Sequence, residues 1–193
     1  MLPTGKKPAV PSAALLAFCN AVPNVFWSGL GLTPISMFCY QCMARPWLYG
    51  LLAASLLAYA IPKAWFGRWQ LSHRLAAYQR LGVHFVNRFT QHGDIVHSLL
   101  RRWYPQYRHV RGRAAVPALI SATYHQERFH LVGLVFFLLT TLYAAALGCA
   151  GWAGLLLLTN VAYNLYPMWL QQYIRVRLGA SSCAPSPPPP RPA

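Results

Sequence analysis

The sequence has very few acidic side chains. Only two of its 193 residues are acidic, Asp94 and Glu127, against 17 Lys and Arg. Charged residues make up only 10% of the chain and the formal net charge is +15, whereas soluble domains are typically about 25% charged. Such a chain has almost no carboxylates to form surface ion pairs. The composition therefore excludes an ordinary soluble domain and favours a membrane protein.

Charge is also missing over long stretches. No charged side chain occurs between Lys7 and Arg45, between Arg45 and Lys63, or between Arg128 and Arg175. A hydrocarbon core of about 30 Å needs roughly 20 apolar residues in a helix, so the last interval can hold two crossings. The sequence predicts membrane segments at 12–43, 46–61, 131–147 and 152–169.

The first of these segments, 12–43, contains Pro23 and Pro34. Proline removes a backbone hydrogen bond from a helix, so we expect one crossing together with an irregular or re-entrant piece. Two lysines before an apolar run also resemble a signal peptide. However, the bulky Phe18 stands where lipoprotein cleavage needs a small residue, and no small-x-small site follows. We therefore favour an uncleaved first helix.

The basic residues orient the predicted helices, because most of them lie in the segment 63–128. The positive-inside rule places this segment and both termini in the cytoplasm, with Arg45 as the one exception. The predicted fold class is all-α, with about four transmembrane helices and an amphipathic, interfacial segment between the second and third. The predicted divisions are a cytoplasmic N-terminus at 1–11, membrane helices at 12–62, the basic interfacial segment at 63–128, a membrane hairpin at 129–170, and a basic, then Pro-rich and disordered tail at 171–193.

Other functional classes lack the residues that they need. Membrane topology and attraction to anionic lipid account for the positive charge, so the bilayer is the expected partner and nucleic acid is not. Cys39 and Cys42 form a lone pair without a second pair or a nearby His, so a structural zinc site has too few ligands. The seven histidines, between His73 and His130, are not spaced for a metal. No glycine-rich phosphate-binding motif is present, and the oligomeric state stays open.

Glu127 and His130 form the most specific chemical pattern. They stand one helical turn apart at the start of a long apolar run, and positions i and i+3 share a helix face. The carboxylate could therefore orient the imidazole as a base that activates a hydroxyl. An alternative is that Glu127 only offsets the charge of Arg128 or of the helix end. Both interpretations stay open at this stage.

Asn160 and Asn164 lie four residues apart within an apolar segment. Amides in a membrane helix are costly unless they are paired or line a site. In the predicted topology this polar end of the last crossing reaches the same side of the bilayer as Glu127 and His130. Helix-to-helix hydrogen bonding and interfacial anchoring are the alternative explanation. Earlier in the chain, 94–103 is predicted to form a short amphipathic helix with Asp94 as its cap.

Four motifs follow one another in a characteristic order. They are Tyr78–Val83, Gly93–His97, Glu127–His130 and Asn164–Leu178. In this order and spacing the chain resembles the glycosyl-4,4'-diaponeurosporenoate acyltransferase family, over roughly residues 60–178. The resemblance implies a bacterial cell-membrane acyltransferase. Its partners would be an acyl donor, such as acyl-CoA or another thioester, and a glycosylated carotenoid or similar glycolipid as acceptor, without a cofactor or metal.

The resemblance also suggests roles for individual residues. His130 would take the proton of the sugar hydroxyl, and Glu127 would fix its tautomer. The anionic groups of the donor would bind Arg101, Arg102, Arg175 and Arg177. The acceptor or oxyanion would bind Asn164, Tyr166 and Gln171, and further substrate-binding candidates are Asp94 and Tyr173. Two alternatives remain, namely another lipid-modifying membrane enzyme and a non-enzymatic membrane scaffold.

Overall fold

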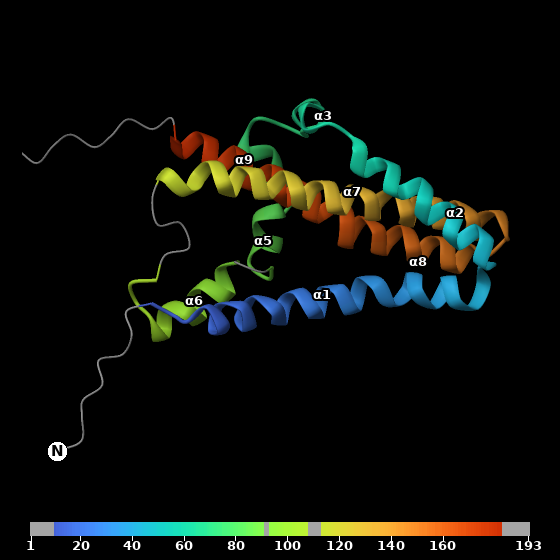
Figure 1. Ribbon diagram of the computed structural model, residues 1–193, viewed down its shortest axis with the longest axis horizontal. Coiled ribbons are helices and arrows are strands. Elements are labelled where there is room, and N and C mark those ends of the chain that lie inside the picture. Colours follow the sequence, from blue (N-terminus) through green and yellow to red (C-terminus); the bar gives the residue numbers. More distant parts are fainter. Residues whose placement is uncertain (1–9, 91–92, 108–112, 183–193) are drawn as a thin grey trace, which may run out of the picture.

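The computed structural model describes residues 10–90, 93–107 and 113–182. All regular secondary structure in these ranges is helical (Figure 1), which confirms the predicted all-α class. The α-helices are α1 (Ala13–Cys42), α2 (Arg45–Leu56), α3 (Lys63–Arg68), α4 (Leu75–Arg80), α5 (Val83–Asn87), α6 (Asp94–Trp103), α7 (Val116–Ala146), α8 (Ala150–Asn160) and α9 (Tyr166–Ser182). Between them lie the 3-10 helices η1 (Leu57–Ala60) and η2 (Arg113–Ala115) and the π-helical turn η3 (Val161–Leu165).

Two of the described helices, α1 and α7, are long and apolar enough to cross a membrane, with 30 and 31 residues. At 1.5 Å per residue each is about 45 Å long, more than the hydrocarbon core requires. The other two predicted crossings do not form single α-helices of that length. The span at 46–61 ends as α2 at Leu56 and continues as η1, and the span at 152–169 is divided by η3. Hydropathy detects the apolar stretch but not the change of helix type within it.

The outer surface of the long helices is apolar. Phe18, Phe26 and Leu30 on α1 and Leu138 and Leu142 on α7 are all exposed. The most apolar stretch of α1 has none of its residues buried within the protein. Contiguous apolar surface of this extent is unfavourable in water and is satisfied by lipid. The protein is therefore a membrane protein.

The prediction of an irregular piece within 12–43 is wrong. Pro23 and Pro34 both lie inside the continuous helix α1, which begins after Ser12. The Ser12 hydroxyl accepts a hydrogen bond of 3.2 Å from the backbone N–H of Leu15 and so caps the helix. Each proline removes one backbone hydrogen bond from the helix. Unwinding the helix would leave more backbone groups without partners in an apolar segment, at a cost of roughly several kcal/mol for each group.

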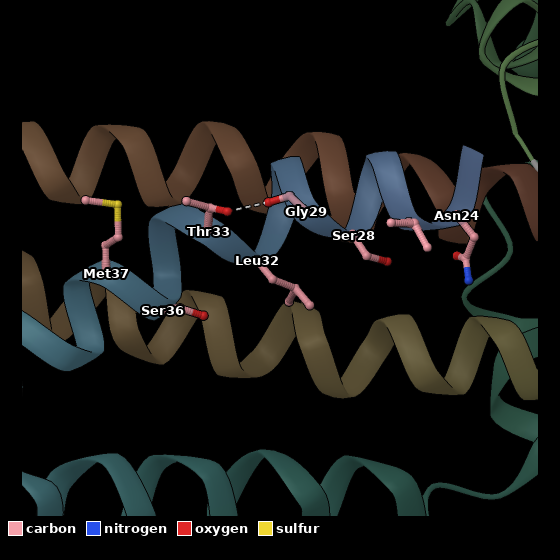
Figure 2. A pocket seen from close by; sticks show the side chains of 8 residues that line it. Asn24, Ser28, Gly29, Leu32, Thr33, Ser36 and Met37 are labelled. Carbon is pink, nitrogen blue, oxygen red and sulfur yellow. Dashed lines mark hydrogen bonds between the residues drawn. The ribbon is translucent and has the colours of Figure 1, made fainter. Parts of the chain in front are cut away.

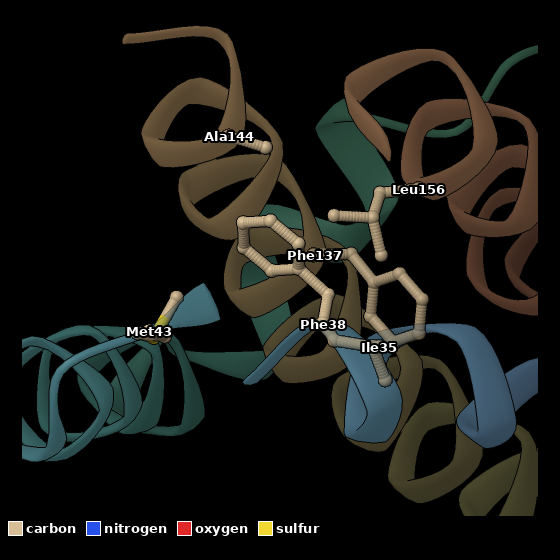
Figure 3. Close-up of a cluster of buried hydrophobic side chains, with 6 residues drawn as sticks. All are labelled: Ile35, Phe38, Met43, Phe137, Ala144 and Leu156. Atoms are coloured by element: carbon tan, nitrogen blue, oxygen red, sulfur yellow. The ribbon is translucent and has the colours of Figure 1, made fainter. Parts of the chain in front are cut away.

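The main hydrophobic core joins α1 and α2 to the hairpin of α7 and α8. Phe38 of α1, Phe137 of α7 and Leu156 of α8 are almost completely buried against one another (Figure 3). The hairpin turns at Gly148, whose φ of 74° is in the left-handed region that glycine adopts without strain. This core holds one end of α1. The opposite end packs on α6 through a smaller cluster that includes Leu15, Leu16, Val96 and Leu100.

Helix α9 runs back along α7, and α4 and α5 cover it (Figure 1). Tyr78 and Val83 from this covering segment are buried against Leu170 and Tyr173 of α9. Residues 171–182 therefore continue the helix rather than belonging to a tail, because α9 gains partners on two sides. The rest of the predicted Pro-rich tail, 183–193, lies outside the described residues.

Helix α6 begins and ends where the sequence predicted, at Asp94 and Trp103. The predicted cap is wrong, since Gly93 is the N-cap and Asp94 is the first helical residue, with no side-chain capping hydrogen bond. A carboxylate in the first turn still interacts favourably with the helix dipole, so Asp94 can stabilise the helix without capping it.

We predict that Gly31→Ala weakens the docking of α1, whereas Gly29→Ala does not. A Cβ atom on Gly31 would lie within 2.4 Å of the Tyr163 ring, but one on Gly29 meets nothing within 4 Å. The ring cannot move without losing its own packing, so an overpacking cost of about 1–3 kcal/mol is expected. Thermal unfolding of both variants in detergent measures the difference. Equal melting temperatures would contradict the prediction.

Candidate active site

Glu127 lies where α7 packs on α9, and only 1% of it is exposed. Its Oε1 accepts a hydrogen bond of 2.6 Å from Nε2 of Gln172. Its Oε2 lies 2.5 Å from Nη1 of Arg175, which is itself only 6% exposed. The only acidic side chain near the membrane hairpin is thus half of a buried ion pair. Such a pair is held by mutual attraction in surroundings where either charge alone is costly.

The guanidinium of Arg175 has an aromatic partner as well. It lies over the ring of Tyr124, with 4.1 Å between its Cζ atom and the ring centroid. The ammonium of Lys63 lies 4.6 Å from the same centroid. Nη1 of Arg175 is also 3.5 Å from the hydroxyl of Thr123. Cation–π attraction and the Glu127 carboxylate together hold the Arg175 side chain in place.

Gln172 extends this arrangement to the segment before α4. Its Oε1 accepts hydrogen bonds from the backbone N–H of Leu71 at 3.0 Å and from the Tyr78 hydroxyl at 3.2 Å. The same hydroxyl lies 2.9 Å from the carbonyl oxygen of Ser72. Burial raises the pKa of the Tyr78 phenol, so the hydroxyl stays a donor. We call Glu127, Arg175, Gln172 and Tyr78 the Glu127–Arg175 network; it ties α7, α9 and α4 together.

His130 lies one turn further along α7 and faces η3. Its ring is edge-on to that of Tyr163, with centroids 6.1 Å apart. The side chain of Asn164 and the backbone of Tyr163 lie beside the ring. Its Nδ1 atom is buried and has no hydrogen-bond partner. The ring is therefore oriented from one side and has one nitrogen left over.

The predicted hydrogen bond between Glu127 and His130 is wrong. Both carboxylate oxygens face α9, where they meet Gln172 and Arg175. A buried carboxylate gains more from a guanidinium than from a neutral imidazole, because both partners of the ion pair are charged. The predicted meeting of this part of α7 with the polar end of the last membrane segment is nevertheless present.

The two asparagines of that segment are paired. Asn164 donates a hydrogen bond of 2.9 Å to the side chain of Asn160, which donates one of 3.1 Å to the carbonyl oxygen of Leu134. Asn164 stands in η3, and isolated π-helical turns occur frequently at functional sites. The two amides therefore join the helices and also lie at the candidate site beside His130. The two explanations given by the sequence, helix-to-helix hydrogen bonding and a place in the site, do not exclude each other.

We predict that Gly133→Ala destabilises this contact. A Cβ atom on Gly133 would lie 2.4 Å from Oδ1 of Asn164, whereas one on Gly154 meets nothing within 4 Å. Displacing the buried amide from its partners should cost about 1–3 kcal/mol and outweigh the helix propensity gained from Ala. Thermal unfolding in detergent tests this. Gly154→Ala, a control on α8, should be neutral or stabilising; the same loss there would contradict the explanation.

The other predicted site residues fall into two groups. Four lie on α9 beside the network. The Tyr166 hydroxyl donates a hydrogen bond of 3.2 Å to the carbonyl oxygen of Leu81, and Tyr173 is buried against Tyr78. Gln171 is half-buried and Arg177 is exposed. Asp94, Arg101 and Arg102 do not join them. These three are exposed on α6, which packs against the start of α1 and not against α7 or α9 (Figure 1). Their predicted place in the same site is therefore not supported by the fold.

Several side chains of the site were not predicted. Tyr124 and Tyr163 make direct contacts with the candidate residues. Gln172 and Tyr78 do so as well, although the sequence places them in motifs without assigning them a role. Neither hydropathy nor spacing distinguishes them from ordinary interfacial aromatics and amides. Within the described part of the chain, no three His, Cys, Asp or Glu side chains gather closely enough to hold a metal ion.

These features define a helical membrane protein with a buried polar site between two paired helices. Comparison with known protein families matches residues 62–181 to the glycosyl-4,4'-diaponeurosporenoate acyltransferase family. The match covers more than half of the chain, so the protein belongs to this family, as the resemblance predicted. Glu127, His130, Asn164 and Arg175 lie within the match, whereas α1 and α2 precede it. No curated protein and no solved structure matches the chain.

Proposed function

We propose that the protein transfers a fatty acyl group from a thioester donor, such as acyl-CoA, to a sugar hydroxyl of a glycosylated carotenoid or similar glycolipid. The observation that carries the proposal is the His130 ring, which lies beside Asn164 and Tyr163 and whose Nδ1 has no hydrogen-bond partner within the described part of the chain. It lies within the region matched to the acyltransferase family. An oriented imidazole with one free nitrogen is the group needed to activate a hydroxyl.

In the proposed reaction the sugar hydroxyl attacks the thioester carbonyl carbon. The imidazole of His130 takes the hydroxyl proton as the new O–C bond forms. When the tetrahedral intermediate collapses, the C–S bond breaks and the imidazolium returns the proton to the thiolate. Asn164 keeps the ring in place. A carbonyl or amide oxygen beside one imidazole nitrogen favours the tautomer in which that nitrogen carries the proton, so the other nitrogen can act as the base.

Glu127 takes a different role from the one that the sequence suggested. Its carboxylate neutralises Arg175 and accepts from Gln172, so it positions α9 against α7. In this proposal the anionic part of the donor is bound by exposed cations near the site, such as Arg177 on α9 and Lys63 on α3. Glu127 and Arg175 are thus positioning residues in this proposal.

The proposed location is a bacterial cell membrane, with the segment 63–128 and both termini in the cytoplasm. The concentration of basic residues in that segment supports it. In this topology α1 and α7 each cross the membrane as a single helix. The second crossing consists of α2 followed by η1, and the fourth consists of α8, η3 and α9. Cysteine accessibility at exposed positions of α4 and of the 148–149 turn tests it: only the turn should react from outside.

The reaction is tested in a bacterial host that makes a glycosylated carotenoid but does not acylate it. Mass spectrometry of lipid extracts, with and without the protein, should show a new species heavier by one fatty acyl group. Membranes from the same cells, supplied with palmitoyl-CoA and extracted glycolipid, should release free CoA at an increased rate. If neither acylated product nor released CoA is found for any glycolipid tried, the proposed function is wrong.

A second candidate is a non-enzymatic membrane scaffold. It is favoured by the burial of Glu127, Asn164 and Arg175, each with 6% or less of its surface exposed, which is also what purely structural polar groups show. The scaffold hypothesis expects His130→Ala to unfold or mislocalise the protein without a specific chemical defect. The acyltransferase hypothesis expects a folded protein with unchanged membrane insertion and no acyl transfer.

A further inference from the structure

Three cations that end the uncharged stretches of the sequence come together in the structure. They are Lys63, Arg128 and Arg175. Lys63 and Arg175 both lie over the ring of Tyr124. Arg128 lies over the ring of Phe66, and the centroids of the two rings are 6.4 Å apart. The core of a bilayer excludes charge, so cations at the ends of uncharged stretches mark the depth of the lipid headgroups.

Arg128 of α7 is held against the segment that leads into α3. Its Nη2 donates a hydrogen bond of 3.1 Å to the carbonyl oxygen of Ile61. Its Cζ atom lies 5.2 Å from the ring centroid of Tyr59 and 5.9 Å from that of Phe66. Lys63 follows Ile61 by two residues in the same segment. Residues of η1, α3 and α7 thus bring the guanidinium and the ammonium to one place.

The positive charge of these residues is not balanced within the protein. Glu127 is already paired with Arg175. The other acidic residue of the sequence, Asp94, lies on α6, which packs on the start of α1. Among the described residues, Lys63 and Arg128 therefore have no carboxylate partner. Two neighbouring positive charges at headgroup depth favour an anion from outside the chain.

Helix geometry separates this place from the candidate base. Successive residues of an α-helix are about 100° apart, so Arg128 and His130 point to nearly opposite sides of α7. Their contacts agree, because Arg128 meets η1 and α3 whereas His130 meets Tyr163 of η3. A phosphate bound at Arg128 would lie across α7 from the reacting groups. This separation favours the phosphate of a lipid headgroup over the phosphates of the acyl donor.

The neighbouring surface suits the rest of a phospholipid. Leu56 and Leu57, in the uncharged stretch that Lys63 ends, are both exposed, so lipid chains can lie along them. Tyr59 and Trp65 are exposed close to the cations, and such aromatic residues are typical of the membrane interface. By contrast, the residues that line the hollow along α1 (Figure 2) include no charged side chain, so that surface has nothing to hold a charged headgroup.

We propose that Lys63 and Arg128 together bind the phosphate of an anionic phospholipid. The guanidinium offers donors that fit phosphate oxygens, and the ammonium adds a point charge. A headgroup with a net negative charge, such as that of phosphatidylglycerol, offsets more of the excess positive charge than zwitterionic phosphatidylcholine does. In this inference Lys63 serves the lipid, which leaves Arg177 for the anionic part of the acyl donor. The bound lipid joins η1 and α3 to α7.

The test measures lipid binding by the full-length protein in a neutral detergent. Native mass spectrometry compares the retention of phosphatidylglycerol and of phosphatidylcholine with the same chains, and the wild-type protein should prefer phosphatidylglycerol. Arg128→Gln should weaken phosphatidylglycerol binding by about tenfold, as expected for the loss of one hydrogen bond to a charged group. Lys63→Gln, a change of an exposed side chain, should weaken it as well. Arg80→Gln removes one exposed charge from α4 and is the matched control, which should bind like the wild type.

A second measurement locates the lipid in the wild-type protein. Phosphatidylglycerol with a photoreactive diazirine next to its phosphate should label residues 59–66 or 124–128. Labelling spread evenly over the apolar surface, or equal retention of both lipids by every variant, would mean that only bulk lipid covers this place and would overturn the inference. If Lys63→Gln and Arg128→Gln lost binding of coenzyme A but kept phosphatidylglycerol, the site would belong to the donor and the inference would also be wrong. None of these readouts requires acyl transfer, so a failure of the proposed function would be seen separately.

Discussion

Replacing Glu127 with Ala is expected to lower the free energy of unfolding by about 3–5 kcal/mol, the typical cost of removing one partner from a buried ion pair. Arg175 would keep its charge in a place where only 6% of it is exposed. Gln172 would lose the acceptor for its Nε2 group at the same time. Thermal unfolding in detergent, followed by circular dichroism, measures the effect.

A double replacement shows how much of this loss comes from leaving the charge of Arg175 unpaired. Glu127→Gln combined with Arg175→Gln removes both charges at once, so it should be less destabilising than Glu127→Ala alone. Arg80→Ala on α4, an exposed cation outside the network, should have little effect. If Glu127→Ala melted at the wild-type temperature, or if the double variant were the least stable, the ion pair would not hold the helices as we describe.

Replacing His130 with Ala is expected to lower the rate of acyl transfer by about 10²–10⁴-fold, the usual contribution of a general base. Stability should change much less than in Glu127→Ala, because His130 is only partly buried and its Nδ1 has no partner to lose. Release of CoA by purified protein in liposomes containing the glycolipid gives the rate. The melting temperature of the same preparation shows whether the protein is intact.

His125→Ala is the matched control for this experiment. His125 is exposed on the same helix, α7, and precedes the network. It should keep the wild-type rate. A normal rate in His130→Ala would remove this residue from the mechanism, and a parallel loss in both variants would indicate a general effect on α7 rather than catalysis.

Family membership, the all-helical class and the helix at 94–103 could all be read from the order of residues along the chain. Each depends on local information: motif order, apolar periodicity, and a helix bounded by Gly93 and Pro105. The sequence also indicated that Glu127 and His130 would meet the polar end of the last membrane segment. That inference needed only the expected hairpin between them, because a hairpin brings its two outer ends together.

The partners within the site could not be obtained in this way. Helical spacing puts Glu127 and His130 on the same face of α7, but the carboxylate contacts Arg175 and the imidazole lies beside Asn164 and Tyr163. Which partner a side chain takes depends on how α9 is rotated and shifted against α7, and many residues of both helices determine that packing together.

The shortage of acids, the long uncharged runs and the motif order thus established a membrane-embedded helical acyltransferase family member from local chemistry alone. The seating of α1 on Tyr163, the exclusion of α6 from the site and the pairing of Glu127 with Arg175 depended on long-range packing. Such contacts join residues up to 135 positions apart in the chain. They are chosen by the close fit of whole helix surfaces, which no short stretch of sequence encodes.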